Sequence, residues 1–218
     1  MEKLDYKKKF KELYQPKPVP SVLDVPQMTF IAIDGRGNPN DENGEYQSAV
    51  HTLYALSYAI KMMPKSGNTP TDYFEYVVPP LEGLWWLVDR DEFDYSSKSK
   101  FCWTSMIRQP KFVTEEVFRA ACEITAKKKP QLDLSKARLE TFTEGLCVQC
   151  MHQGSFDDEP ATLEKMRAFM TEHGLQSDLS GTRRHHEIYL SDPRKVDISK
   201  MKTVLRVPVK RNEGDENS

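Results

Sequence analysis

Apolar residues recur along this chain with two different periods, one typical of strands and one typical of helices. The same order of strand-like and helix-like segments occurs twice. Alternating or continuous apolar runs rich in strand-forming residues lie at 28–35, 73–88, 101–108, 138–151, 184–190 and 201–208. Apolar residues at helical spacing occupy 45–62, 114–127 and 160–173. The pattern therefore predicts strand, helix, strand, strand, then a linking helix, and then strand, helix, strand, strand again.

The helix predicted at 45–62 has a clear apolar stripe, formed by Tyr46, Val50, Leu53 and Ile60. Residues at this spacing fall on one side of a helix, so the helix is expected to pack on a sheet. The long run at 73–88 is expected to be a single extended strand, bent where its double proline removes two amide donors.

The repeated order predicts an α+β fold made by tandem duplication of a strand-helix-strand-strand (SHS2) unit. Two such units can pair edge to edge about a pseudo-twofold axis and share one antiparallel sheet. Helices would cover one face of this sheet, and the other face would form a ligand cleft.

The domain limits follow from where this pattern begins and ends. Residues 1–20 are predicted to be an N-terminal arm, helical at 3–14 and extended in the proline-rich stretch that follows. The domain is expected to span 21–210, with units at about 28–108 and 138–208. Residues 211–218 are polar and are expected to be a disordered tail.

Composition narrows the function classes. The chain has 218 residues, 38% of them hydrophobic, and a formal net charge of −2, which indicates a globular protein without the basic excess of a nucleic-acid-binding surface. No stretch approaches the roughly 20 apolar residues of a membrane span. The N-terminus has no apolar signal-peptide core, so the protein is expected to be cytoplasmic, without direct nucleic-acid or membrane binding.

Cys147 and Cys150 are three residues apart, as in half of a zinc site. They lie in a predicted strand, where residues three apart point to opposite faces. The interpretation favoured is therefore two small buried side chains and no metal. Glycine-rich phosphate loops, a G-x-S-x-G nucleophile elbow and an H-E-x-x-H zinc motif are all missing from the sequence.

The stretch HHEIYL (185–190) alternates in polarity. Ile188 and Leu190 would point toward the packed helices, while His185, Glu187 and Tyr189 would point to the other side. These polar residues could line a ligand cleft or be solvated surface residues, and the spacing does not decide between the two. His185 and His186 diverge, so they cannot both bind one metal ion.

The segment from Tyr76 to Trp86, YVVPPLEGLWW, places two tryptophans side by side after a lone carboxylate. In a regular strand Glu82 and Trp86 share a face and Trp85 lies on the other, so one ring could serve the core and one a cleft. Two other interpretations stay open. Both rings could be core with Glu82 capping a turn, or a bulge at the prolines could exchange the faces.

Three stretches, VVPPLEGLWW, FCWTSMIRQPKFVT and HHEIYLSDPRK, resemble the GyrI-like small-molecule-binding family, and within it the stand-alone proteins. The resemblance covers about residues 20–210. It implies two units around a central pocket that binds bulky aromatic, often cationic compounds against a buried glutamate. Some stand-alone members hydrolyse cyclopropanoid toxins, and others are known as multidrug binders.

Carried onto this sequence, the resemblance matches Glu187 to the pocket glutamate and Tyr189 to its neighbour. Glu82, Trp85 and Trp86 match the PLEGLWW segment of the stand-alone branch. The candidate catalytic residues are therefore Glu187 and Glu82, one of which would take a proton from the attacking water. The candidate substrate-binding residues are aromatic: Tyr189, Trp85, Trp86, Trp103, Tyr46 and Tyr76.

The expected function is hydrolysis of planar hydrophobic electrophiles in a bacterial detoxification role, with neither metal nor organic cofactor. The alternative is a non-catalytic drug-binding or sensing protein, or one that modulates a partner such as gyrase. The sequence leaves the oligomeric state open.

Overall fold

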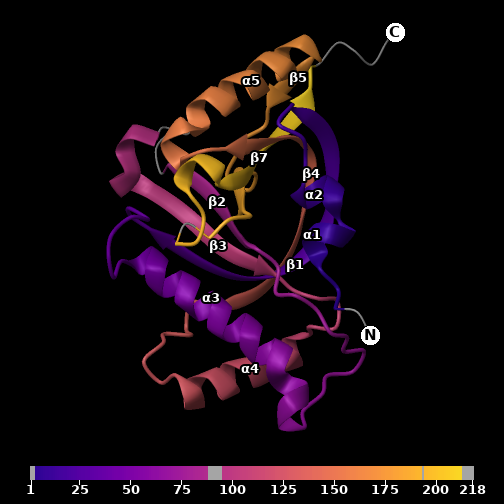
Figure 1. Ribbon diagram of the computed structural model, residues 1–218, viewed down its shortest axis with the longest axis vertical. Coiled ribbons are helices and arrows are strands. Elements are labelled where there is room, and N and C mark those ends of the chain that lie inside the picture. The colour runs from indigo at the N-terminus through magenta and orange to yellow at the C-terminus, as the bar shows by residue number, and fades with distance from the viewer. Residues whose placement is uncertain (1–2, 88–94, 193, 213–218) are drawn as a thin grey trace.

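The computed structural model describes residues 3–87, 95–192 and 194–212 (Figure 1). Its α-helices are α1 (Tyr6–Lys9), α2 (Lys11–Tyr14), α3 (Glu45–Met62), α4 (Glu115–Lys128) and α5 (Glu159–Glu172). Its strands are β1 (Ser21–Arg36), β2 (Leu81–Leu87), β3 (Phe101–Arg108), β4 (Arg138–Gln153), β5 (Leu175–Ser177), β6 (His185–Tyr189) and β7 (Lys202–Arg211). Short 3₁₀ helices are η1 (Met63–Ser66), η2 (Tyr95–Lys100), η3 (Phe156–Asp158) and η4 (Ile198–Lys200).

The strands of the described residues form one antiparallel sheet that closes on itself. Its order is β4-β1-β3-β2-β6-β7-β5, and β4 also pairs with β7. The first six strands of this order therefore make a barrel, and β5 extends the end of β7. Closure gives the sheet an inner and an outer face, and side chains alternate between them along each strand.

Helices α3 and α5 pack on the outside of the barrel. Helix α3 lies against β1 and β3 and contacts α4, while α5 lies against β4 and β5 at the other end of the molecule (Figure 1). The larger apolar cluster joins α3, the barrel interior and the N-terminal helices. A smaller cluster is formed between α5 and strands β4 and β7.

The predicted fold class is confirmed: the protein is α+β, with an antiparallel sheet and helices packed on its outer face. The element order β1-α3-β2-β3 is followed by β4-α5-β6-β7, with the short strand β5 inserted, which the pattern did not predict. Strands β1 and β4 pair with each other, as do β2 and β6. That this order arose by duplication stays a prediction.

Two strands differ by several residues from their predicted starts. Strand β1 begins at Ser21 rather than at 28, because the ladder with β4 continues on both sides of Pro26. Strand β2 begins only at Leu81, because Pro79 and Pro80 cannot donate to a ladder. Before the prolines, Tyr76 makes a single bridge to Leu4.

A parity change accompanies Pro26. Val25 and Met28 are both buried although they are three residues apart, so the side that faces inward changes between them. On the paired strand, Gly145 has a φ of +73°, a conformation that suits glycine. Glu144, next to Gly145, lies inside the barrel, where it contacts other buried polar groups.

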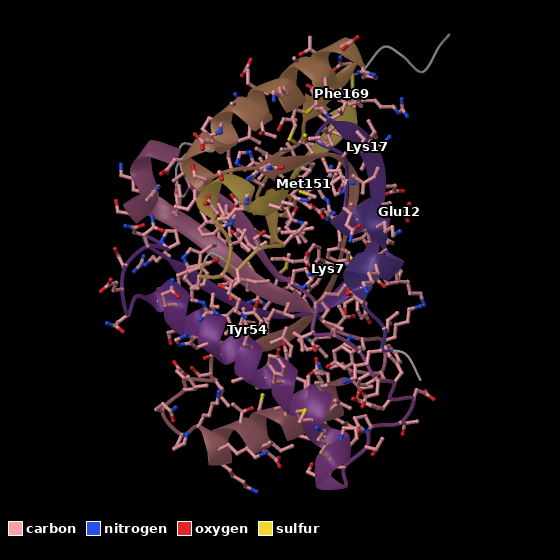
Figure 2. All side chains as sticks on the ribbon, viewed as in Figure 1. Lys7, Glu12, Lys17, Tyr54, Met151 and Phe169 are labelled. Atoms are coloured by element: carbon pink, nitrogen blue, oxygen red, sulfur yellow. The ribbon has the colours of Figure 1, made fainter. Side chains whose placement is uncertain are left out.

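The N-terminal arm packs on the barrel rather than extending from it. Figure 2 shows Lys7, Glu12 and Lys17 along its course beside the strands. Tyr14 and Leu13 are buried. The Arg108 guanidinium lies 4.9 Å from the Tyr6 ring and 4.6 Å from the Phe10 ring, which holds α1 over the end of β3. Of the predicted tail, only residues 211 and 212 fall within the described part of the chain.

Among the described residues, none of the helices has the length and apolarity that crossing a bilayer would require.

Candidate functional site

Strand β6 separates two groups of buried polar side chains. Pairing with β2 places Glu187 opposite Gly83 and His185 opposite Trp85, while His186 lies opposite Leu84. Directly paired residues share a face, so His185, Glu187 and Tyr189 lie on one side of the sheet and His186 and Ile188 on the other. The predicted alternation is therefore present, and both sides of the strand are buried.

The two sides of β6 are exchanged relative to the prediction. Ile188 was expected to face the helices, but it belongs to the inner face of the barrel and lies opposite Glu82. The side with Glu187 and Tyr189 faces α3, whose Tyr46 packs on Trp85. The prediction was wrong because barrel closure buries the inner face, so a buried apolar residue such as Ile188 need not face the helices.

On the outer face, Glu187 has a defined set of hydrogen-bond partners. The Tyr189 hydroxyl donates to Glu187 Oε2 at 2.7 Å, and His185 Nε2 lies 3.2 Å from Oε1. The Trp85 indole N–H donates to the Tyr189 oxygen at 2.8 Å. Burial raises the pKa of Tyr189 well above its ordinary value, and the Glu187 charge raises it further. Tyr189 therefore stays protonated and acts as a donor to the carboxylate.

The beginnings of α3 and α5 flank this carboxylate. Tyr46, in the first turn of α3, has its ring centroid 5.5 Å from that of Trp85 and 5.2 Å from that of Trp103. On the other side, Phe156 of η3 packs edge-on against Tyr189 at 5.8 Å. Aromatic rings from both halves of the chain thus surround a carboxylate that is only 5% exposed.

Two glycines allow these rings to lie flat on the sheet. A Cβ on Gly83 would lie 2.7 Å from the Trp85 indole nitrogen and 3.1 Å from the Tyr189 oxygen. A Cβ on Gly35 would lie 2.2 Å from the Trp103 ring. Any side chain at either position would displace a ring, so glycine is required there for steric reasons rather than for backbone conformation.

The inner face carries a second group, centred on His186. Its Nε2 lies 3.0 Å from Glu82 Oε2, and its Nδ1 lies 3.0 Å from Glu144 Oε2. Burial alone would lower the pKa of His186, but the charge of Glu144, the hydrogen bond to Glu144 and the close contact with Glu82 raise it to about 9. His186 is therefore a buried cation at neutral pH.

Arg206 is the other buried cation of the inner group. It donates to Glu144 Oε2 at 3.0 Å, to the Leu13 carbonyl at 3.0 Å and to Gln149 Oε1 at 3.2 Å. Burial alone would raise the pKa of Glu144, but the charges of His186 and Arg206 hold it at about 2. Two carboxylates and two cations thus balance one another inside the barrel.

The structure brings together five of the eight predicted site residues, namely Glu187, Tyr189, Trp85, Trp103 and Tyr46. Glu82 lies on the opposite face, fully buried, and accepts a hydrogen bond from the Tyr14 hydroxyl at 3.2 Å. Trp86 also lies away from Glu187, with the Arg184 guanidinium 4.6 Å from its ring.

Tyr76 is the third predicted residue outside the cluster. It is buried among Tyr73, Phe74 and Phe112, next to the bridge with Leu4. Its segment lies before the double proline, so it does not continue the strand that carries Trp85.

Several residues of the two groups were not singled out by the sequence pattern. Glu159 and Phe156 lie near the start of α5, and only the packing of that helix brings them to β6. Glu144 and Arg206 are charged residues in apolar strands, which was a usable signal, because charges are seldom buried without a partner.

Cys147 and Cys150 are both buried and lie in different apolar clusters, on opposite sides of β4. The predicted divergence of these two thiols is confirmed. A different set of potential metal ligands exists on the outer face, where ligand atoms of Glu159, His185 and Glu187 all lie within 4.8 Å of one another.

A known protein family matches most of the chain. The family model described as the GyrI-like small molecule binding domain matches residues 18–210. The search of curated proteins gives no match.

Several solved structures are similar to this chain. An uncharacterized conserved protein from Listeria innocua is 48% identical, with a TM-score of 0.90, and the match covers 95% of this chain and 100% of that one. A protein described as a hydrolase from Listeria innocua is 47% identical, with a TM-score of 0.87 and the same coverage. The EcmrR C-terminal domain shares only the fold, at 10% identity and a TM-score of 0.51 over 88% of this chain and 97% of that one.

Proposed function

The chain belongs to the family of GyrI-like small molecule binding domains, and from this premise we propose that it is a hydrolase. It binds a planar hydrophobic molecule beside Glu187 and opens a strained ring, such as an activated cyclopropane, by adding water. Two relatives of known structure that are 47% identical are described as hydrolases, which supports this reaction class.

One observation carries the proposal: a carboxylate is held by fixed donors among aromatic rings. Tyr189 and His185 orient the two oxygens of Glu187, and Trp85 in turn orients Tyr189. Rings around a carboxylate exclude water and offer flat apolar faces to a planar ligand. A positioned carboxylate can take a proton from the single water that attacks.

Glu187, rather than Glu82, is the proposed base. Glu82 lies inside the barrel against the protonated His186 and beneath Tyr14. A carboxylate that neutralises a buried cation contributes to stability and is not free to exchange protons with a substrate. Glu187 lies instead beside the half-buried rings of Tyr46 and Tyr189, at the edge of the protein interior.

The proposed step balances without a cofactor. The oxygen of water forms a bond to a cyclopropane carbon while its proton passes to Glu187. The broken carbon–carbon bond leaves its electron pair in the conjugated aromatic system. The proton held by Glu187 then returns to the product, so the net change is addition of one water. General base assistance of this kind contributes about 10²–10⁴-fold to the rate.

The test is turnover of a cyclopropane fused to a planar aromatic ketone, followed by chromatography of the ring-opened product. Glu187→Gln should lower kcat about 10²–10⁴-fold. Glu82→Gln is the matched control, because it removes a buried carboxylate from the other face. Measured well below its melting temperature, it should keep most of the wild-type rate.

The same experiment distinguishes the non-catalytic alternative. If the wild-type protein binds the compound but product does not exceed the blank, the protein is a binding or sensing module and the hydrolase proposal fails. Equal losses in both variants would instead mean that the base has been assigned wrongly.

A further inference from the structure

We propose that Glu159, His185 and Glu187 form a binding site for one divalent transition-metal ion, with Zn²⁺ as the reference ion. The three residues come from the start of α5 and from alternate positions of β6. All three are at least nine-tenths buried.

The spacing of the residues suits a shared ion. His185 and Glu187 are two apart on a strand, so they project from the same face, and their ligand atoms are 3.2 Å apart. The ligand atoms of all three residues lie within 4.8 Å of one another. Zn²⁺ binds nitrogen and carboxylate oxygen at about 2.0–2.2 Å with tetrahedral geometry, so two of its ligand atoms are separated by about 3.4 Å. Shifts of less than about 1 Å in each side chain would bring the three ligand atoms to this separation.

The types of donor atom narrow the choice of metal ion. Imidazole and carboxylate are both zinc ligands, and a set of three protein ligands, as in catalytic zinc sites, leaves a position open for water. Calcium takes six to eight oxygen ligands and magnesium prefers oxygen alone, so neither fits a set containing imidazole.

A further contact supports the assignment. Glu187 uses one oxygen toward His185, and its other oxygen accepts from Tyr189, which Trp85 holds in turn. Outer hydrogen bonds of this kind orient metal ligands and are needed for full affinity. His186, the neighbouring histidine, points into the barrel and takes no part.

This inference concerns the same place as the proposed hydrolysis but does not depend on it. With an ion bound, Glu187 would act as a ligand, and the ion would lower the pKa of the attacking water. Without an ion, the carboxylate itself takes the proton. The overall addition of water is the same in both cases.

The test uses full-length protein without a polyhistidine tag, stripped by a chelator and then dialysed against Zn²⁺. Mass spectrometry of the metal content should find about one ion per chain in the wild type. His185→Gln and Glu159→Gln should each weaken binding at least about 10-fold. His51→Gln, which changes an exposed histidine of α3, is the matched control and should bind like the wild type.

Absence of bound ion in the wild type would overturn the inference, and so would binding that the His185 and Glu159 substitutions leave unchanged. If these variants do not fold, imidazole resonances of the wild type give the answer: Zn²⁺ must shift those of His185 and leave those of His51 in place. Absence of Zn²⁺ binding together with turnover by ion-free protein would overturn the metal site and leave the proposed hydrolysis by Glu187 standing.

Discussion

The indole N–H of Trp85 donates a 2.8 Å hydrogen bond to the hydroxyl of Tyr189 across the surface of Gly83. The two residues belong to neighbouring strands, and the pair Gly83–Glu187 lies between them in the register. The contact therefore passes directly beside the Glu187 carboxylate, to which Tyr189 donates. Trp85 thus determines where the Tyr189 hydroxyl points and, through it, the orientation of Glu187.

Gly83→Ala is predicted to break this chain of hydrogen bonds. The new Cβ would meet the Trp85 indole nitrogen at 2.7 Å, so the ring must move away from Tyr189. Overpacking of this kind costs about 1–3 kcal/mol of folding free energy. Urea denaturation would measure the loss, and quenching of tryptophan fluorescence by a planar dye should weaken.

Gly181→Ala is the control for this substitution, because a Cβ there meets nothing within 4 Å. It should leave both the stability and the quenching unchanged. Wild-type quenching in Gly83→Ala would show that the Trp85 ring does not need its present place to meet a ligand.

The two glutamates are predicted to differ in their effect on stability. Glu82→Gln leaves His186 with one carboxylate partner instead of two inside the barrel. Removing one member of a buried ion pair costs about 3–5 kcal/mol. Glu187→Gln keeps an acceptor for Tyr189 and should cost no more than about 1 kcal/mol. Denaturant titration of both variants gives the comparison, and a more stable Glu82→Gln than Glu187→Gln would contradict the assignment of the two faces.

Acid should destabilise the protein through Glu144. Its pKa is about 2 in the folded state, below the ordinary value of 4.5, so the unfolded state binds its proton first as the pH falls. The contribution is fully present above about pH 4.5 and is lost progressively toward pH 2, by an amount on the order of 2–3 kcal/mol. The measurement is the free energy of unfolding at a series of pH values from 7 to 3.

Glu144→Gln provides the comparison for this pH series. The variant is less stable at pH 7, because His186 and Arg206 lose a counter-charge, but its stability should fall less steeply in acid. Parallel curves for the variant and the wild type would mean that other carboxyl groups cause the acid dependence.

The N-terminal arm is predicted to contribute to stability through Tyr14. Its hydroxyl donates to the fully buried Glu82, so Tyr14→Phe removes one of the hydrogen bonds to that carboxylate. Loss of a buried hydrogen bond of this kind costs about 1–3 kcal/mol. Tyr58→Phe removes a hydroxyl from an exposed ring of α3 and serves as the control. The measurement is the melting temperature of both variants. Equal melting temperatures would mean that the arm is only loosely attached.

Much of the architecture could be predicted from local pattern. The stripe of Tyr46, Leu53 and Ile60 predicted α3, and the apolar run at 101–108 predicted β3 with its observed limits. Period-two alternation also predicted that Glu187 and Tyr189 share a face. These features depend on residues that are close in sequence, so the local sequence alone determines them.

Which face meets the helices was decided only by the tertiary structure. Closure of β4 on β7 buries the inner face, and α3 and α5 bury the outer one, so both sides of β2 and β6 are largely buried. The local pattern of apolar and polar residues therefore could not show which of Glu82 and Glu187 lies inside the barrel. Barrel closure places the first against His186 and the second beside the helix starts, because contacts between distant strands depend on the whole fold.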